Sequence, residues 1–544
     1  HRSARLEALL RERIVILDID EKSLAEEGRW PWRRDRLALL MDKLFDRYHV
    51  AVVGFDVVFA EKDESSGLPV LQELARKQLK DVPQFASALN QIKSQLEFDQ
   101  VFANRIKGRP VIMGYYFSAA EAGAKSTSSG ALPQPALPAG TFAGRPIAFT
   151  SWDGYGGNLP QLLAAAAGAG HFNPLIDFDG VTRRVPMLVE YQGGYYESLP
   201  LAMVRALLGF PPLEPGFEDV DAAAGYGGLE WLYLKTDRGT LKIPVDQNVA
   251  TLIPYRGRQG SFKYISVSDV LRDRVDVNDL QGKVVLIGTT APGLLDLRAT
   301  PVAAVYPGVE IHANMIAGML DQNLKLKPPY VLAAEVLQLL VSGLLLALLL
   351  PLLNPLKATV TTLIVAFFML SSNLMVWHYG QMVLPMATGV ILILGMYVVN
   401  VSYGYFVEAR SKRQITGLFG RYVSPDLVDE MAKDPEQVSM EGESREMSVL
   451  FTDVRGFTTI SEGMEPRELS KLMNEFLTPL TQLIYDHRGT VDKYMGDCIM
   501  AFWGAPLADS DHARHALEAG LHMQATLAEL RPQFQTRGWP EVRI

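Results

Sequence analysis

The chain has 544 residues, which is too long for one ordinary domain and suggests three or four structural units. Hydrophobic residues make up 48% of it and charged residues 21%, and a mean hydropathy of +0.08 indicates membrane segments mixed with soluble domains. The net charge of −9 argues against nucleic acid as a partner, because no basic stripe dominates. The single cysteine, Cys498, excludes an internal disulfide, so a domain outside the cytosol must be held by its core alone.

Both ends of the chain look cut. It begins at His1 with no visible signal peptide, and Pro540–Ile544 alternates like the start of a strand. We therefore expect the chain to be a fragment of a longer protein.

Residues 1–327 carry the pattern of a soluble α/β domain. Short apolar runs predict strands at 14–17, 51–59, 111–113 and 284–287. Apolar residues at three-and-four spacing predict helices over 37–48 and 308–320. Strands that alternate with helices indicate a largely parallel sheet covered on both faces. Residues 119–140, rich in Ala, Gly, Ser and Pro, predict a mobile surface loop.

Three apolar segments follow in close succession. They cover 331–350, 358–377 and 382–406, and a helix needs roughly 20 apolar residues to cross a bilayer. A buried helical hairpin in a soluble domain is the alternative, and three such runs back to back argue against it. We therefore expect three transmembrane helices within residues 328–407, followed at 408–444 by a coupling linker that is helical as far as Arg421.

The basic residues beside these segments predict the orientation of the chain. Lys357 in the first connecting loop and the cluster at 410–413 fall on the same side, which the positive-inside rule places in the cytoplasm. Lys325 and Lys327 weaken this signal slightly. We expect a multi-pass protein of the bacterial inner (plasma) membrane with residues 1–327 periplasmic or extracellular. An export signal or an earlier span must then precede His1.

The carboxylate of Glu335 lies about one turn into the first apolar segment. Intramembrane carboxylates are functional suspects by default, but those near a helix end are the mildest cases. Glu335 either faces the other helices or reaches the interface.

Two aspartates after the third segment carry the strongest functional signal. Asp453 follows a strand predicted at 447–451, and Asp497 lies in a hairpin turn beside Gly496. Paired carboxylates at fixed positions hold divalent cations against a polyphosphate. The alternative is a structural role, because Asp favours turns.

Gly456 allows a tight turn just after Asp453. The backbone N–H groups of Gly456, Phe457 and Thr458 can then point toward phosphate oxygens at a helix start. Further on, an amphipathic helix carries His512, His515 and His522, which we interpret as helix-surface residues.

These segments resemble the class III nucleotidyl cyclase catalytic domain, an α+β (ferredoxin-like) fold. Residues 451–458 (Phe-Thr-Asp-Val-Arg-Gly-Phe-Thr) are similar to the first metal motif of that family, and residues 492–497 (Asp-Lys-Tyr-Met-Gly-Asp) to the second. The resemblance covers residues 445–544. The family also needs a second adenine-contacting residue, an asparagine and an arginine, which would all lie beyond Ile544. We therefore expect a C-terminally truncated domain that is inactive as given.

The resemblance implies a role for each motif residue. Asp453 and Asp497 would be catalytic and, with the Val454 carbonyl, would hold two Mg²⁺ ions, with Mn²⁺ as an alternative. Lys493 stands at the purine-contacting position, where lysine is typical of adenylyl cyclases and glutamate of guanylyl cyclases, so ATP is favoured. Residues 456–458 would contact the substrate. The family forms a head-to-tail homodimer through this domain, with metal aspartates from one chain and Lys493 from the other.

Residues 1–327 resemble the second type of CHASE extracytoplasmic sensor domain. The resemblance rests on residues 18–23, 30–34, 54–56, 170–173, 177–184, 286–291 and 308–313. In that family three membrane spans and a cytoplasmic output follow. No ligand is implied. Asp18, Asp20 and Asp56 either line a pocket at the strand ends or act as structural caps.

The sequence thus predicts a multidomain protein with an α/β sensor, three transmembrane helices and a partial cyclase domain. Its predicted function is that of a receptor-type adenylate cyclase, which converts ATP to cyclic AMP and pyrophosphate by two-metal catalysis. Its expected partners are ATP, a second copy of the chain, the lipid bilayer and an unknown extracytoplasmic ligand, but no nucleic acid. The alternatives are a guanylate cyclase and a non-enzymatic receptor with a degenerate cyclase-like output domain.

Overall fold

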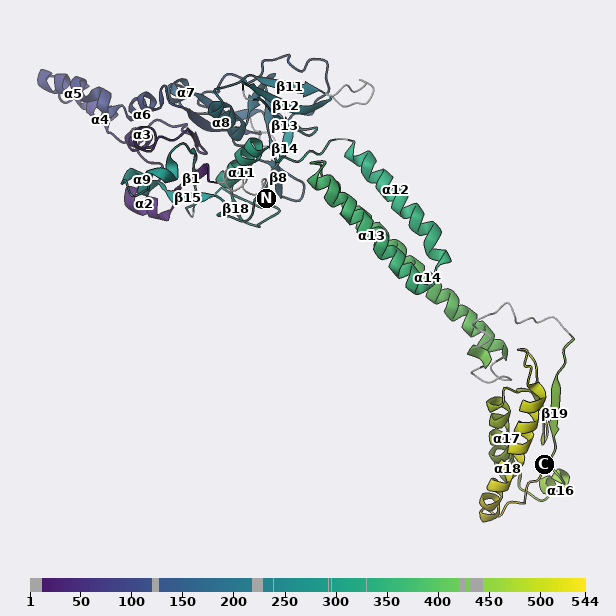
Figure 1. Ribbon diagram of the computed structural model, residues 1–544. Helices are drawn as coiled ribbons and strands as arrows, with labels where there is room; N and C mark the ends of the chain where they lie inside the picture. Colours follow the sequence, from purple (N-terminus) through teal and green to yellow (C-terminus); the bar gives the residue numbers. More distant parts are fainter. Residues whose placement is uncertain are drawn as a thin grey trace. The chain divides into compact units, whose positions relative to one another are not determined.

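The structure is a computed structural model, and Figure 1 traces its elements in chain order. It describes residues 12–119, 127–217, 228–237, 239–291, 293–294, 296–328, 330–419, 427–429 and 444–544. The chain divides into two compact units, one of residues 1–342 with 364–391 and one of residues 343–363 with 392–544.

Among the described residues, the N-terminal unit is built on an eight-stranded sheet. Its order is β15 (Lys263–Ser266), β1 (Ile14–Ile19), β16 (Val284–Thr289), β2 (Val52–Phe55), β3 (Val111–Ser118), β5 (Gly154–Gly156) and β4 (Ser128–Ser129), and β6 (Gly168–His171) also pairs with β3. The pairings from β15 across to β3 and β6 are parallel, whereas β5 is antiparallel to β3. The expected α/β architecture with a largely parallel sheet is confirmed.

Helices and small sheets surround this sheet. The helices are α2 (Glu21–Glu27), α3 (Arg34–Asp42), η1 (Lys43–Arg47), α4 (Leu68–Arg76), α5 (Pro83–Leu96), α6 (Phe98–Ile106), α7 (Pro160–Ala165), α8 (Leu199–Leu207), α9 (Val267–Leu271), α10 (Val277–Leu280) and α11 (Gly308–Asp321). The small sheets are made of β7 (Leu175–Ile176), β8 (Thr182–Pro186) and β14 (Ala250–Leu252), of β9 (Leu188–Tyr191) and β10 (Gly194–Glu197), of β11 (Leu213–Phe217), β12 (Leu229–Thr236) and β13 (Gly239–Pro244), and of β17 (Leu297–Arg298) and β18 (Tyr306–Pro307).

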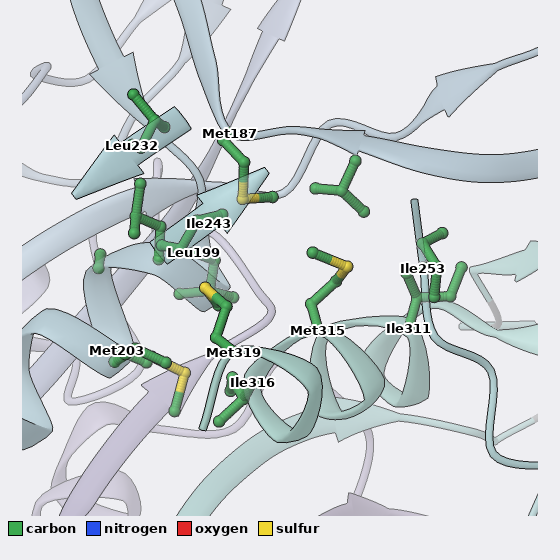
Figure 2. Close-up of a cluster of buried hydrophobic side chains, with 14 of the residues drawn as sticks. Met187, Leu199, Met203, Leu232, Ile243, Ile253, Ile311, Met315, Ile316 and Met319 are labelled. Atoms are coloured by element: carbon green, nitrogen blue, oxygen red, sulfur yellow. The ribbon is translucent and has the colours of Figure 1, made fainter. Parts of the chain in front are cut away.

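The two faces of the large sheet belong to two hydrophobic cores, because side chains alternate along each strand. Ile14 and Ile16 of β1 join the core that contains α8 and α11. Val15 and Leu17 join the core that contains α3 and α6. Figure 2 shows the first core, in which side chains of α11 lie with those of Leu199 and Met203 of α8, Leu232 of β12 and Met187, the residue after β8. Both faces of the large sheet are therefore buried.

Two sequence expectations differ in detail from the structure of this unit. The strand predicted at 51–59 is present only over Val52–Phe55, because the chain bends at residues 56–57, and the backbone N–H of Phe59 donates to Asn158 Oδ1 at 2.8 Å rather than to a strand. In the predicted loop, residues 127–140 are ordered against the sheets through β4 and through reciprocal backbone bonds of 3.2 and 3.1 Å between Leu137 and Tyr195. The rest of that loop, residues 120–126, lies outside the described residues.

Within the part of the chain that the structure describes, three helices are long and apolar enough to cross a membrane, as predicted. They span Val331–Leu352, Pro355–His378 and Ala387–Phe406. They correspond to α12 (Val331–Leu349) with η3 (Leu350–Leu352), α13 (Pro355–His378) and the first part of α14 (Ala387–Phe419). The linker expected to be helical as far as Arg421 is helical to Phe419, and residues 420–426 lie outside the described residues.

Glu335 of α12 has a partner on another helix. The Thr388 hydroxyl of α14 donates to Glu335 Oε1 at 2.6 Å. Of the two alternatives for this carboxylate, the structure therefore favours contact with a neighbouring helix over the lipid interface.

The C-terminal residues 444–544 form an antiparallel sheet in the order β19 (Ser448–Thr452), β21 (Cys498–Trp503) and β20 (Thr490–Met495). The helices are α16 (Phe457–Glu462), α17 (Pro466–Asp486) and α18 (His512–Thr536). One face of the sheet packs on α17 and α18 around Trp503 and Phe476. On the other face, Val449 and Phe451 are exposed. This sheet therefore has one covered face.

Candidate functional site

The two aspartates of the cyclase-like motifs lie at the same end of the small sheet. Asp453 follows β19, and Asp497 lies with Gly496 in the two-residue loop that joins β20 to β21. Gly496 has a φ of 64°, in the left-handed region that favours glycine. The backbone N–H of Val454 donates to Asp497 Oδ2 at 3.1 Å. This bond ties the loop that bears the second aspartate to the residue after the first.

The neighbouring thiol responds to both carboxylates. Burial raises the pKa of Cys498, and the negative charges of Asp453 and then Asp497 raise it further. The thiol is therefore held in its protonated form, and the end of the sheet is a region of negative potential.

The turn after Asp453 is closed by its own backbone. Gly456 has a φ of 69°, and the Phe457 N–H donates to the Val454 carbonyl at 3.3 Å. A carbonyl oxygen has two lone pairs, so Val454 retains one for another partner. The Arg455 N–H donates to the Arg543 carbonyl at 2.8 Å, which anchors the turn to the C-terminal segment. Thr458 lies in the first turn of α16.

Lys493 lies on the open face of the small sheet. Its cross-strand partner is Met500, which in turn faces Phe451 on β19. The ammonium nitrogen lies 3.2 Å from Asp492 Oδ2, and the side chain is 58% exposed. The structure thus places Lys493 among exposed apolar residues, on the same hairpin as Asp497.

Close packing supports the hairpin from behind. α17 ends at Asp486, and Arg488 adopts a φ of 65° before Gly489. A Cβ atom on Gly489 would lie 2.6 Å from Ile484 Cγ2 and 2.7 Å from the Trp503 ring. The sequence suggested only that this glycine ends a helix, whereas the structure shows that it lets the helix end meet β21.

The histidines of α18 have local partners. His512 Nδ1 lies 2.9 Å from Ser448 Oγ, His515 Nδ1 lies 2.7 Å from Asp509 Oδ2, and His522 Nδ1 lies 2.9 Å from His487 Nε2. These contacts attach α18 to the surrounding segments. In the described parts of the chain, no group of three or more His, Cys, Asp or Glu side chains is arranged to hold a metal ion by itself.

The acidic residues at the strand ends of the N-terminal domain have structural partners. Asp18 accepts a bond from the Thr290 N–H at 3.0 Å and another from the Thr290 hydroxyl, and Asp20 caps α2 by accepting from the Ser23 N–H at 2.8 Å. Burial raises the pKa of Asp18 to about 6, although the bonds from Thr290 oppose the rise. Asp56 Oδ1 lies 3.4 Å from His312 Nε2. Of the two alternatives, these contacts favour the structural role.

Two buried histidines were not singled out from the sequence. His171 of β6 is completely buried, and neither of its ring nitrogens has a hydrogen-bond partner. Burial, assisted by the charge of His312, lowers the pKa of His171 to about 3. Both residues lie in stretches that carry the resemblance to the CHASE domain, but burial cannot be read from such a match.

Comparisons with known proteins match both ends of the chain. The family model described as the CHASE2 domain matches residues 2–352. The family model described as the Adenylate and Guanylate cyclase catalytic domain matches residues 440–541.

Individual relatives match the C-terminal part of the chain. Adenylate cyclase 1 of Rhizobium meliloti (strain 1021) is 32% identical over 125 residues, which are 23% of this chain and 19% of that protein. Adenylate cyclase of Anabaena cylindrica is 36% identical over 105 residues, or 19% of this chain and 20% of that protein. The crystal structure of the guanylyl cyclase Cya2 is 37% identical, covers 19% of this chain and 52% of that one, and has a TM-score of 0.19. The chain therefore spans about a fifth of the length of these two curated relatives.

Proposed function

This chain belongs to the CHASE2 domain family, and we propose that it is a receptor-type adenylate cyclase that converts ATP to cyclic AMP and pyrophosphate. Its C-terminal part carries a cyclase catalytic domain, and proteins named adenylate cyclase are among its relatives. The observation that carries the proposal is the bond from the Val454 N–H to Asp497, because it attaches the second motif aspartate to the residue that follows the first.

The donor atoms at this point fit Mg²⁺. Magnesium prefers oxygen ligands, usually one or two carboxylates, and completes its octahedron with water and substrate phosphates. Asp453 and Asp497 would hold two ions with the free lone pair of the Val454 carbonyl, and Mn²⁺ fits the same donors. Bound there, the ions supply activation of the ribose 3′-hydroxyl and offset charge on the leaving pyrophosphate.

The protein groups have distinct tasks in the proposed site. Asp497 is held in one orientation by the Val454 N–H, as a metal ligand fixed by an outer hydrogen bond would be. Asp453 is exposed, so a nucleotide from solvent reaches it. The turn of Gly456, Phe457 and Thr458 follows directly and is the proposed contact for the triphosphate.

The proposed enzyme is a homodimer in which Lys493 of one chain meets the nucleotide held at the aspartates of the other. The open face of the small sheet supports this arrangement. Phe451, which lies across Met500 from Lys493 on the same face, is 59% exposed, and contiguous exposed apolar surface marks protein contacts. An ammonium group donates a hydrogen bond to an adenine ring nitrogen, whereas a glutamate would accept one from guanine. Lys493 therefore favours ATP over GTP.

The proposed layout places the cyclase under the control of the other domain. Residues 1–327 form the extracytoplasmic sensor, residues 328–407 cross the bacterial inner membrane three times, and residues 408–444 couple the spans to the cytoplasmic catalytic domain at 445–544. The three apolar helices support this order, since the first ends the CHASE2 match and the other two lie between it and the cyclase match. A sensor ligand would act by changing the geometry of the catalytic dimer.

The nucleotide preference of the complete gene product tests the proposal. We expect cyclic AMP from ATP in the presence of Mg²⁺, and little cyclic GMP from GTP. Lys493→Glu should shift the preference toward GTP, while Lys471→Glu on the exposed surface of α17 should leave it unchanged. A preference for GTP in the unaltered protein would favour the guanylate cyclase alternative. A folded dimer that turns over neither nucleotide would favour the non-enzymatic receptor.

A further inference from the structure

A cavity of about 660 Å³ lies where the N-terminal domain meets the loop between α13 and α14. Its walls come from segments 252–256, 301–302, 323–325 and 377–383, together with Arg183 of β8. All of these segments belong to one compact unit. The cavity is therefore a feature of the junction between the sensor domain and the membrane helices.

The segment that leaves the sensor domain is hydrogen-bonded to that loop. The Leu326 N–H donates to the Gln381 carbonyl at 2.8 Å, and the Val383 N–H donates to the Leu326 carbonyl at 3.1 Å. Lys325 Nζ donates to Gln381 Oε1 at 2.6 Å and to the Trp377 carbonyl at 3.0 Å. Any group bound in the cavity would thus contact the sensor exit and the loop between two membrane helices at once.

The lining combines positive charge with apolar surface. Arg183, Arg256 and Lys325 contribute positive charges, and the described lining residues include no Asp or Glu. Arg183 is paired with Asp177 and Asp179, and Arg256 with Asp321, but none of these three aspartates lines the cavity. Leucine, isoleucine, valine and proline side chains form much of the remaining wall. This lining suits a molecule with an anionic end and an apolar end.

Aromatic residues of the kind found at membrane surfaces lie at the cavity and just beyond it. Trp377 is the second-last residue of α13, and Lys325 Nζ lies 4.9 Å from the centre of its ring. Tyr379, two residues on, is 87% exposed. Trp and Tyr gather at membrane–water interfaces, where their rings sit among lipid head groups.

We propose that this cavity binds the anionic head group and upper acyl chain of a phospholipid from the surrounding leaflet. The cations meet the phosphate, and the apolar walls meet the chain. A small soluble anion would leave those walls uncovered, which is why the lipid is favoured. The proposal rests on the proposed insertion of α12, α13 and α14 in a bilayer. Through it, the composition of the membrane would adjust the coupling between the sensor exit and the spans.

Quenching of Trp377 fluorescence in nanodiscs tests the proposal on the complete gene product. Two kinds of disc are compared, both made mainly of phosphatidylcholine. One contains a minor fraction of phosphatidylglycerol with brominated chains, and the other the same fraction of phosphatidylcholine with brominated chains. Bromine quenches the fluorescence of a nearby indole. Subtracting the signal of Trp377→Phe isolates the contribution of Trp377. We expect about a fivefold preference for the anionic lipid, the factor that one basic residue near an anionic surface provides.

Substitutions at two lysines distinguish binding in the cavity from general attraction of the protein to a charged surface. Lys325→Gln should remove the preference, whereas Lys327→Gln, exposed and outside the lining, should keep it. Equal quenching by both lipids, or a preference that Lys325→Gln leaves intact, would overturn the proposal. Relief of quenching by soluble glycerol phosphate would assign the cavity to a free anion and also overturn it. Failure of the protein to enter the discs would instead count against membrane insertion itself.

Discussion

The sensor domain and the catalytic domain differ in how many faces of their sheets are buried. Hydrophobic cores cover both faces of the large sheet, whereas the small sheet is covered on one face and exposes Val449, Phe451 and Lys493 on the other. A sheet between two cores is complete in one chain, but an exposed apolar face is an incomplete surface. The N-terminal domain thus has both of its cores within one chain, whereas the open face of the small sheet is the proposed contact with a second copy.

The largest expected effect is a loss of activity in the catalytic domain without a loss of stability. Asp453→Asn in the complete gene product should lower the rate of cyclic AMP formation by about 1000-fold or more, because the proposed metal site loses a charged ligand. The side chain of Asp453 is exposed, so the melting temperature should change little. The matched control is Asp486→Asn at the exposed end of α17, which should retain full activity. Wild-type activity in Asp453→Asn would refute the metal role.

A pair of phenylalanines tests the difference between the two faces of the small sheet. Phe476 is 1% exposed in the core, so Phe476→Ala should destabilise the catalytic domain by about 3–4 kcal/mol. Phe451→Ala on the open face should cost less than about 0.5 kcal/mol in the monomer. Hydrogen exchange of α17 in the solubilised chain measures both changes.

The same pair should behave oppositely in assembly. Phe451→Ala should weaken dimerisation in sedimentation experiments, because it removes apolar surface from the proposed contact. If Phe451→Ala unfolds the monomer as strongly as Phe476→Ala, the open face is part of the core and the contrast between the two domains fails.

Two glycines test how closely the covered face of the small sheet is packed. Gly489→Ala should destabilise the catalytic domain by about 1–3 kcal/mol, because the new methyl group would overlap Ile484 and Trp503. Gly520→Ala in α18 meets only Leu450 Cδ1, at an ordinary 3.5 Å, and should stabilise the helix by up to about 1 kcal/mol. Hydrogen exchange of α17 in the solubilised chain measures both. Equal effects of the two substitutions on stability would show that Trp503 and Ile484 can move to make room for a methyl group at position 489.

Sequence patterns predicted the features that depend on local chemistry. The parallel sheet, the apolar helices and the placement of Asp453 and Asp497 at turns all follow from periodicity and from glycine positions. The errors arose where a distant residue contributes, since the N–H of Phe59, predicted to lie in a strand, donates to the side chain of Asn158. The burial of His171 was missed for the same reason. The cavity beside Trp377 depends on segments that meet only in the folded chain.

The smallest expected effect concerns histidines, which differ between the two domains. His515 of α18 is only partly buried, whereas His171 is sealed in the sensor domain. Burial first, and then the charge of His312, lower the pKa of His171 from 6.5 to about 3. The unfolded chain therefore takes up a proton first as the pH falls. The stability that His171 contributes above pH 6.5 is lost toward pH 3, and about 1.5 kcal/mol disappears between pH 6.5 and 5.

Asp18 acts in the opposite direction. Burial raises its pKa from 3.8 to about 6, so its contribution is present below pH 3.8 and is lost as the pH rises through 6. Between pH 6.5 and 5 it offsets about 1 kcal/mol of the loss at His171, so the unaltered domain should show a nearly flat profile. His171→Phe should then become more stable relative to wild type at pH 5, and Asp18→Asn less stable.

Urea unfolding of residues 1–327 at the two pH values measures these opposed slopes. His49→Asn provides the control, because His49 is exposed and Asn tolerates its φ of 50°. A profile for His171→Phe that parallels wild type would mean that the ring escapes to solvent and takes up its proton at an ordinary pH. The large sheet would then be accessible to solvent at β6, and the sensor domain would resemble the catalytic domain in having an exposed sheet face.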